Sequence, residues 1–186
     1  MSRFAVLDTP LEGLKVVERT LRRDDRGFLA RLFCAQELSE IGWRRPVAQI
    51  NHTLTRQSGA VRGMHFQHAP HAETKLVNCL RGEVWDVAVD LRAGSPTFLR
   101  WHAQRLSADN ACALLIPRGF AHGFQTLTPD CELLYLHDAA YQPASEAAVN
   151  ALDPRIDIRW PREISEMSER DRHHPMLTED FGELPE

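Results

Sequence analysis

Residues 59–91, GAVRGMHFQHAPHAETKLVNCLRGEVWDVAVDL, decide the fold of this chain. Three short apolar runs in this stretch are separated by a loop with Pro70 and a tight turn at Gly82. The runs cover residues 61–67, 75–80 and 83–92. Short alternating runs bounded by Gly and Pro are typical of β-strands. The stretch therefore predicts three strands, which with the loop after the first of them carry an unusual set of reactive side chains: Arg62, His65, His68, His71, Glu73 and Lys75.

Similar runs fill most of the remaining chain at a spacing of roughly ten residues, the pattern expected of a sandwich or barrel. They cover residues 14–21, 28–33, 47–55, 97–106, 111–117, 119–127 and 131–138. We predict one all-β domain over residues 1–186, with an eight-stranded double-sheet jelly roll as its architecture. One helix is expected at residues 35–41. A short helical stretch at 164–174 is expected within an irregular tail, about 150–186, that closes the site.

The composition excludes several classes of protein. A hydrophobic content of 43% with 26% charged residues is ordinary for a soluble domain. The net charge of −4 gives no electrostatic reason to expect nucleic acid or an anionic membrane as a partner. The sequence shows no long apolar run and no signal pattern, so we expect a cytoplasmic protein. The four cysteines are widely spaced in apolar surroundings, which favours reduced core residues.

The strand at residues 61–67 indicates where chemistry could occur. Alternation puts His65 on the same face as Gly63 and Gln67, opposite Arg62. A histidine between a glycine and a glutamine on one strand face is expected to point into a polar cavity. Lys75 is the first residue of the next strand and can face the same cavity. A base and a cation facing one cavity suit proton abstraction next to a carbonyl group. The same pattern is also compatible with a purely structural histidine, so both interpretations stay open.

The histidine-rich segment 65–73 and the turn before His122 also resemble the two halves of a cupin metal site. Histidines three apart on a strand point to opposite faces, however, and His68 and His71 flank Pro70 in a loop. We therefore predict a site without metal. The alternative is a cupin that binds iron, manganese or zinc through His65, His71, Glu73 and His122.

Several longer stretches together resemble one known family. VRGMHFQ, KLVNCLRGEVWDVAVDLRAGSPTF, IPRGFAHGF, LLYLHDAAYQP, DPRIDIRWP and SERD are similar, in this order, to the dTDP-4-dehydrorhamnose 3,5-epimerases, the RmlC-like cupins. The resemblance runs from about Arg26 to Asp171. It implies a cofactor-free jelly roll, normally a homodimer in which strand exchange helps to build each active site. It also implies an isomerase of dTDP-rhamnose and polysaccharide biosynthesis.

The family epimerises a nucleotide-linked 4-keto-6-deoxyhexose at C3 and C5, both of which are α to the ketone. The resemblance implies that His65 is the base and that Asp171 orients it. It further implies that Lys75 stabilises the enolate and that Tyr135 returns a proton to the opposite face. From the residues alone, without the resemblance, core packing is the favoured interpretation of Tyr135 and a solvated helix charge that of Asp171. Substrate contacts are implied for Arg26, Gln49, Asn51, Arg62, His122, Tyr141 and Glu146.

One stretch departs from the family pattern. Where the family has RG-x-F-x-E, this chain has Leu29 and Arg31, so that a cation replaces an acid. We expect this difference to bear on which sugar or nucleotide is bound. One alternative to a dTDP-sugar 3,5-epimerase is therefore a single-centre epimerase of another nucleotide sugar, such as a CDP- or GDP-linked one. Two further alternatives are the metal cupin and a sugar-binding jelly roll without catalysis.

Overall fold

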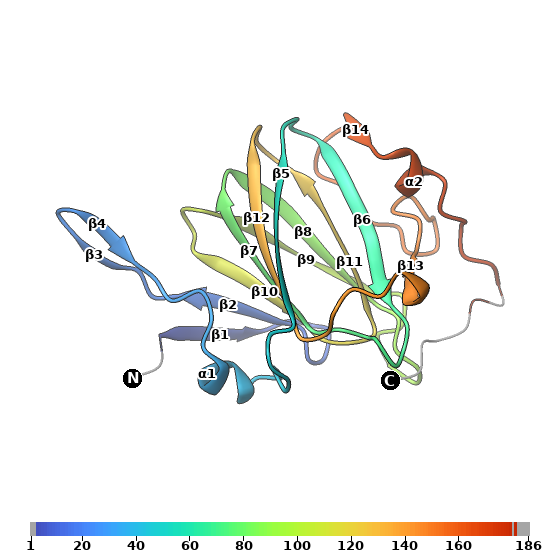
Figure 1. Ribbon diagram of the computed structural model, residues 1–186. Helices are drawn as coiled ribbons and strands as arrows, with labels where there is room; N and C mark the ends of the chain where they lie inside the picture. Colours follow the sequence, from blue (N-terminus) through green and yellow to red (C-terminus); the bar gives the residue numbers. More distant parts are fainter. Residues whose placement is uncertain (1–2, 180, 182–186) are drawn as a thin grey trace.

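The computed structural model describes residues 3–179 and 181, so the ends of the predicted domain at 1–2, 180 and 182–186 lie outside the described residues. Two sheets pack face to face as a jelly roll (Figure 1), which confirms the predicted all-β fold. The first sheet has the order β1 (Phe4–Asp8), β2 (Lys15–Arg19), β10 (Cys112–Ile116), β7 (Lys75–Arg81), β12 (Cys131–His137) and β5 (Gln49–Thr55). The second has the order β13 (Glu146–Ala148), β6 (Ala60–Gln67), β11 (Phe120–Thr126), β8 (Glu83–Asp90) and β9 (Trp101–Ser107).

The core lies between these two sheets. Side chains at alternate positions of each strand point inward, so Val77, Leu133, Val84 and Phe124 meet in one apolar cluster. Toward one end of the sandwich the inward positions become polar. There, Lys75 of β7 lies opposite His137 of β12 in the strand register. The fold thus places polar side chains from both sheets around the same interior space.

The C-terminal part of the chain covers the outer face of the second sheet. Its apolar side chains, among them Val149, Ile156 and Met167, pack on Met64 and Phe66 of β6. A two-residue strand, β14 (Glu166–Met167), runs parallel to β6, and the helix α2 (Glu169–Arg172) follows it. The predicted helix at 164–174 is therefore too long, because Glu166 and Met167 pair with β6 as a strand and the helix begins only at Glu169.

The N-terminal region differs most from the expected strands. The predicted strand at 28–33 shrinks to β4 (Gly27–Leu29), which pairs with β3 (Arg22–Asp24) in an exposed hairpin arm (Figure 1). The strand β1 was not predicted at all. The expected helix at 35–41 is confirmed as α1 (Ala35–Ser39).

The predicted strand at 97–106 begins later, at Trp101. The residues before it form a turn, because the buried carboxylate of Asp90 accepts hydrogen bonds from the hydroxyls of Ser95 and Thr97. Side chains that bond to a nearby carboxylate in this way compete with strand pairing. None of the helices in the described residues is long and apolar enough to cross a membrane.

Candidate active site

Strand β6 brings two predicted site residues to the cavity. Arg62 and His65 both line it, although simple alternation predicts opposite faces for them. The pairing of β6 with β11 shifts register just after His122, which explains the difference. At this point a Cβ on Gly63 would lie 2.5 Å from the Cα of Gly123, so only glycine allows the two strands to approach so closely.

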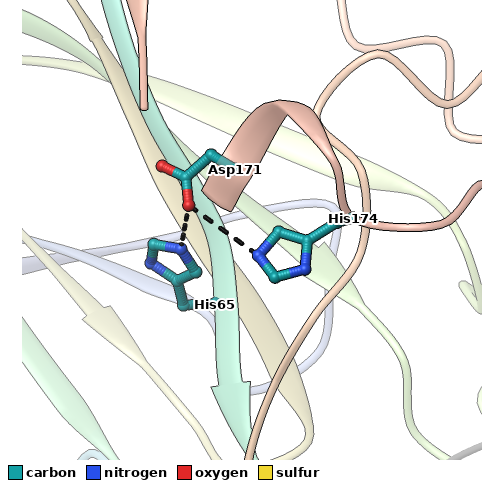
Figure 2. A group of neighbouring side chains, drawn as sticks. All are labelled: His65, Asp171 and His174. Atoms are coloured by element: carbon teal, nitrogen blue, oxygen red, sulfur yellow. Dashed lines mark hydrogen bonds and ion pairs between the residues drawn. The ribbon is translucent and has the colours of Figure 1, made fainter. Parts of the chain in front are cut away.

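Asp171 reaches back from α2 to His65, as the resemblance implied (Figure 2). Its Oδ1 lies 2.7 Å from Nε2 of His65, and its Oδ2 accepts from the backbone N–H of Gly63 at 3.3 Å. The hydroxyl of Ser168 accepts from the Asp171 N–H and caps the helix. Burial opposes ionisation of Asp171, but the bond and charge of His65 and the Gly63 bond outweigh it, so its pKa is lowered. The carboxylate thus holds Nε2 as the N–H, and Nδ1 is the nitrogen left to accept a proton.

Lys75 is held by a buried carboxylate that the sequence interpretation had considered only as a metal ligand. Its Nζ lies 3.1 Å from Oε1 of Glu73 and donates to the carbonyl oxygen of His65 at 3.2 Å. The other Glu73 oxygen contacts Nδ1 of His137 at 2.9 Å and the amide of Gln67 at 3.3 Å. Burial raises the pKa of Glu73, but His137 and Lys75 outweigh it, so the net shift is downward.

Tyr135 lies on the sheet that faces His65. It is 9% exposed, and its ring meets the edge of the His122 ring at a centroid distance of 5.9 Å. His122 is in turn fixed by Asp86, whose Oδ1 lies 2.9 Å from Nε2. Burial and then the charge of Asp86 raise the pKa of Tyr135, so the phenol keeps its proton. The His65–Asp171 pair and the protonated phenol of Tyr135 therefore occupy opposite walls of one cavity.

The cavity has a volume of about 770 Å³, large enough for a sugar nucleotide. At its mouth, the Tyr141 hydroxyl donates to Glu146 at 2.7 Å, and Arg170 pairs with the same carboxylate. Gln49 accepts from the Tyr141 N–H. Ten of the eleven predicted site residues line the cavity: His65, Lys75, Tyr135, Asp171, Gln49, Asn51, Arg62, His122, Tyr141 and Glu146.

Arg26 is the exception. It lies on the exposed arm, paired with Asp24, and does not line the cavity of its own chain. Arg31, the cation at the acidic position of the family pattern, forms an ion pair with Glu37 of α1 at 2.6 Å. The positive charge at this position is thus matched by an acid from elsewhere in the chain.

The sequence interpretation did not single out His137, Arg170 or His174 as site residues, and it considered Glu73 only as a metal ligand. A signal existed for His137, which lies two residues after Tyr135 on a strand and shares its face. The residues of the metal alternative do not gather. Within the described part of the chain, the group of donors that could hold an ion is His65, Asp171 and His174.

The raised pKa of Tyr135 predicts a spectroscopic result. The chain has two tyrosines, so Tyr141→Phe leaves Tyr135 as the sole phenol. Burial favours the neutral form, hence the folded variant should show no tyrosinate absorbance at about pH 11, above the pKa of about 10 of a free phenol. Unfolding the variant in denaturant at the same pH should produce one equivalent of tyrosinate. One equivalent of tyrosinate in the folded variant, with its circular dichroism intact, would refute the buried protonated phenol.

Comparisons with known proteins give a consistent result. The family model described as dTDP-4-dehydrorhamnose 3,5-epimerase matches residues 8–179. A dTDP-4-dehydrorhamnose 3,5-epimerase of Salmonella typhimurium is 40% identical over 92% of this chain and 94% of the relative. A dTDP-4-dehydro-6-deoxyglucose 3-epimerase of Streptomyces bikiniensis is 37% identical over 94% of this chain and 91% of its own. The structure of the Legionella pneumophila dTDP-6-deoxy-D-glucose-3,5-epimerase in complex with dTDP-4-keto-L-rhamnose superposes with a TM-score of 0.90 at 35% identity, covering 98% of this chain and 97% of the other.

Proposed function

This chain belongs to the dTDP-4-dehydrorhamnose 3,5-epimerase family, and we propose that it converts dTDP-4-dehydro-6-deoxy-D-glucose to dTDP-4-dehydro-L-rhamnose. The observation that carries the proposal is the pairing of His65 with Asp171 on one wall of the cavity while Tyr135 faces it from the other sheet. Inversion of a carbon needs a proton taken from one face and returned to the other. An imidazole held by a carboxylate on one wall and a protonated phenol on the other support this reaction.

The proposed mechanism begins at C3 or C5, whose protons are acidified by the C4 ketone. Nδ1 of His65 accepts the proton, and the Asp171 carboxylate stabilises the imidazolium through Nε2–H. The electron pair of the C–H bond moves into the ring, and the negative charge collects on the C4 oxygen. Lys75 stabilises this enolate with its ammonium group. Tyr135 then donates its proton to the opposite face of the carbon, and exchange with solvent restores both groups before the second carbon reacts.

The remaining lining residues support substrate binding. The exposed ring of Tyr141 is proposed to stack on the nucleotide base, with its orientation set by Glu146 and Gln49. Arg62 offers the planar donor geometry that suits a diphosphate. Asn51 and His122 line the part of the cavity near Tyr135 and are proposed to bind the sugar.

We also propose a homodimer, in which the arm of one protomer completes the cavity of its partner. Phe28 and Leu29 on the arm are 59% and 66% exposed, and Ile50 and Leu54 on the edge strand β5 are 58% and 40% exposed. Apolar side chains on an arm and an edge strand favour burial against another chain. This arrangement would bring Arg26 to a substrate in the partner. Sedimentation equilibrium should give twice the mass of one chain, and a monomer at micromolar concentration would contradict the dimer.

The choice of nucleotide and the number of inverted carbons are tested together. Because Arg31 is paired with Glu37, it presents no unpaired cation to a bound nucleotide, and we expect dTDP to remain the preferred nucleotide. Purified protein should convert the dTDP-linked 4-keto sugar, with both centres inverted, and leave the CDP- and GDP-linked sugars unchanged in product analysis. Inversion of C3 alone would instead place the chain with the 3-epimerases, to one of which it is also 37% identical.

A further inference from the structure

His174 has no part in the proposed reaction, yet it faces the catalytic pair. It follows α2, and its carbonyl oxygen accepts from the side chain of Asn150 at 2.6 Å, which fixes its place. Its side chain is 17% exposed, and its Nε2 is buried without a hydrogen-bond partner among residues 3–179 and 181. Buried polar atoms normally have a partner, so an orphan of this kind calls for an explanation.

The orphan nitrogen points at the same carboxylate oxygen that holds His65 (Figure 2). Nε2 of His174 lies 3.8 Å from Oδ1 of Asp171, and Nε2 of His65 lies 2.7 Å from it. The three donor atoms lie within 4.8 Å of one another. In a tetrahedral zinc site with bonds of about 2.0–2.1 Å, donor atoms lie about 3.3 Å apart. The separations of 2.7 and 3.8 Å lie on either side of this value, and no two donor atoms need to approach by more than about 1.5 Å to form the site.

We propose that His65, Asp171 and His174 form a zinc-binding site whose occupation switches off the catalytic pair. Two imidazoles and a carboxylate are a donor set that suits Zn²⁺ and that Mg²⁺ and Ca²⁺ disfavour. An ion can reach the donors through the cavity, which His65 and Asp171 line, and water can supply the fourth ligand. The neighbouring cation Arg170 is paired with Glu146. The carboxylate of Glu146 therefore offsets the repulsion between Arg170 and a bound zinc ion.

Bound zinc would stop catalysis for two reasons. It takes the place of the proton on Nε2 of His65 and occupies the Asp171 oxygen that stabilises the imidazolium. Its positive charge also makes Nδ1 of the same ring a much weaker base, because protonation would add a second charge beside the ion. The inhibition rests on the proposed epimerase function, whereas the binding of zinc does not.

The test measures zinc binding directly. Chelator-treated protein is titrated with Zn²⁺ in competition with a chromogenic chelator, in the wild type and in His174→Ala and His173→Ala. His173 is a matched control, because it is adjacent but its ring is 73% exposed and contacts Glu169. We expect one zinc per wild-type chain and an unchanged Kd in His173→Ala. His174→Ala should bind at least about 10- to 100-fold more weakly, the loss that even an outer partner of a metal ligand produces.

Activity measurements then complete the test, with each variant compared with its own metal-free rate. The zinc concentration that halves the wild-type rate should match the Kd, and His174→Ala should need a correspondingly higher concentration. His174→Asn serves as a second variant if the alanine variant does not fold. An equal Kd in wild type and His174 variants would overturn the site, and binding without inhibition would overturn the switch. If the protein lacks epimerase activity, the Kd comparison still tests the site by itself.

Discussion

His65→Ala is expected to lower kcat by about 10²- to 10⁴-fold, the contribution of a positioned general base. The reason is the geometry of Nδ1, since Asp171 holds the other ring nitrogen at 2.7 Å and fixes the tautomer. Both inversions depend on the same base, so the loss should apply equally at C3 and C5. Turnover with the dTDP-linked 4-keto sugar, measured at saturation, gives the comparison.

The matched control is His68→Ala, which removes an exposed histidine of the loop next to β6. It should retain the wild-type rate, and Asp171→Asn should lose activity while His65 remains. Because Asp171 acts through His65, its loss should fall on kcat more than on KM. A His65→Ala variant that retains its fold and turns over within threefold of the wild type would exclude His65 as the base.

Lys75→Met is expected to have the second-largest effect. The ammonium group lies in the cavity wall and donates to the carbonyl oxygen of His65 at 3.2 Å, and removal of one stabilising donor of this type lowers kcat by about 10²- to 10³-fold. The same substitution leaves Glu73 buried without its cation, and breaking a buried pair in this way destabilises a fold by about 3–5 kcal/mol. A loss of activity in Lys75→Met therefore combines the loss of the stabilising charge with the loss of folded protein.

A double variant separates them. In Glu73→Gln/Lys75→Met the buried position is neutral again, and the amide can still accept a hydrogen bond from His137. We expect its midpoint in urea to recover toward the wild-type value while kcat stays as low as in Lys75→Met. Recovery of activity along with stability would show that Lys75 only supports the fold and does not stabilise the enolate.

The sheet strands were predictable because each is short, alternating and bounded by turn residues. The run at 75–80 matches β7 (Lys75–Arg81), and 131–138 matches β12 (Cys131–His137). The extent of the arm strand β4 and the existence of β14 were not predictable. The arm strand β4 extends as far as its pairing with β3, which ends at Leu29, and β14 is defined by its pairing with β6. Such pairings join segments far apart in sequence or depend on local turns, so periodicity does not reveal them.

The candidate site also contains residues that could be placed from the sequence and residues that could not. His65 and Lys75 could be placed in one cavity because they lie on neighbouring segments, and the family resemblance supplied Tyr135 and Asp171. The alternation rule misplaced Arg62, because a register shift beside Gly63 turns it to the cavity. The bond between Glu73 and Lys75 was missed because a histidine-rich context suggested metal ligation. His174 gave no signal, since its position depends on how the tail folds back.

The most direct test of the central claim is the uptake of deuterium from solvent by the dTDP-linked 4-keto sugar, followed carbon by carbon by NMR. We predict deuterium at both C3 and C5 with the wild type and none above background with His65→Ala. Tyr135→Phe should still exchange but invert less, because it retains the base and lacks the opposing acid. If the wild-type protein exchanges neither C3 nor C5 in any of a panel of dTDP-, CDP- and GDP-linked sugars, the result would contradict proton abstraction by His65.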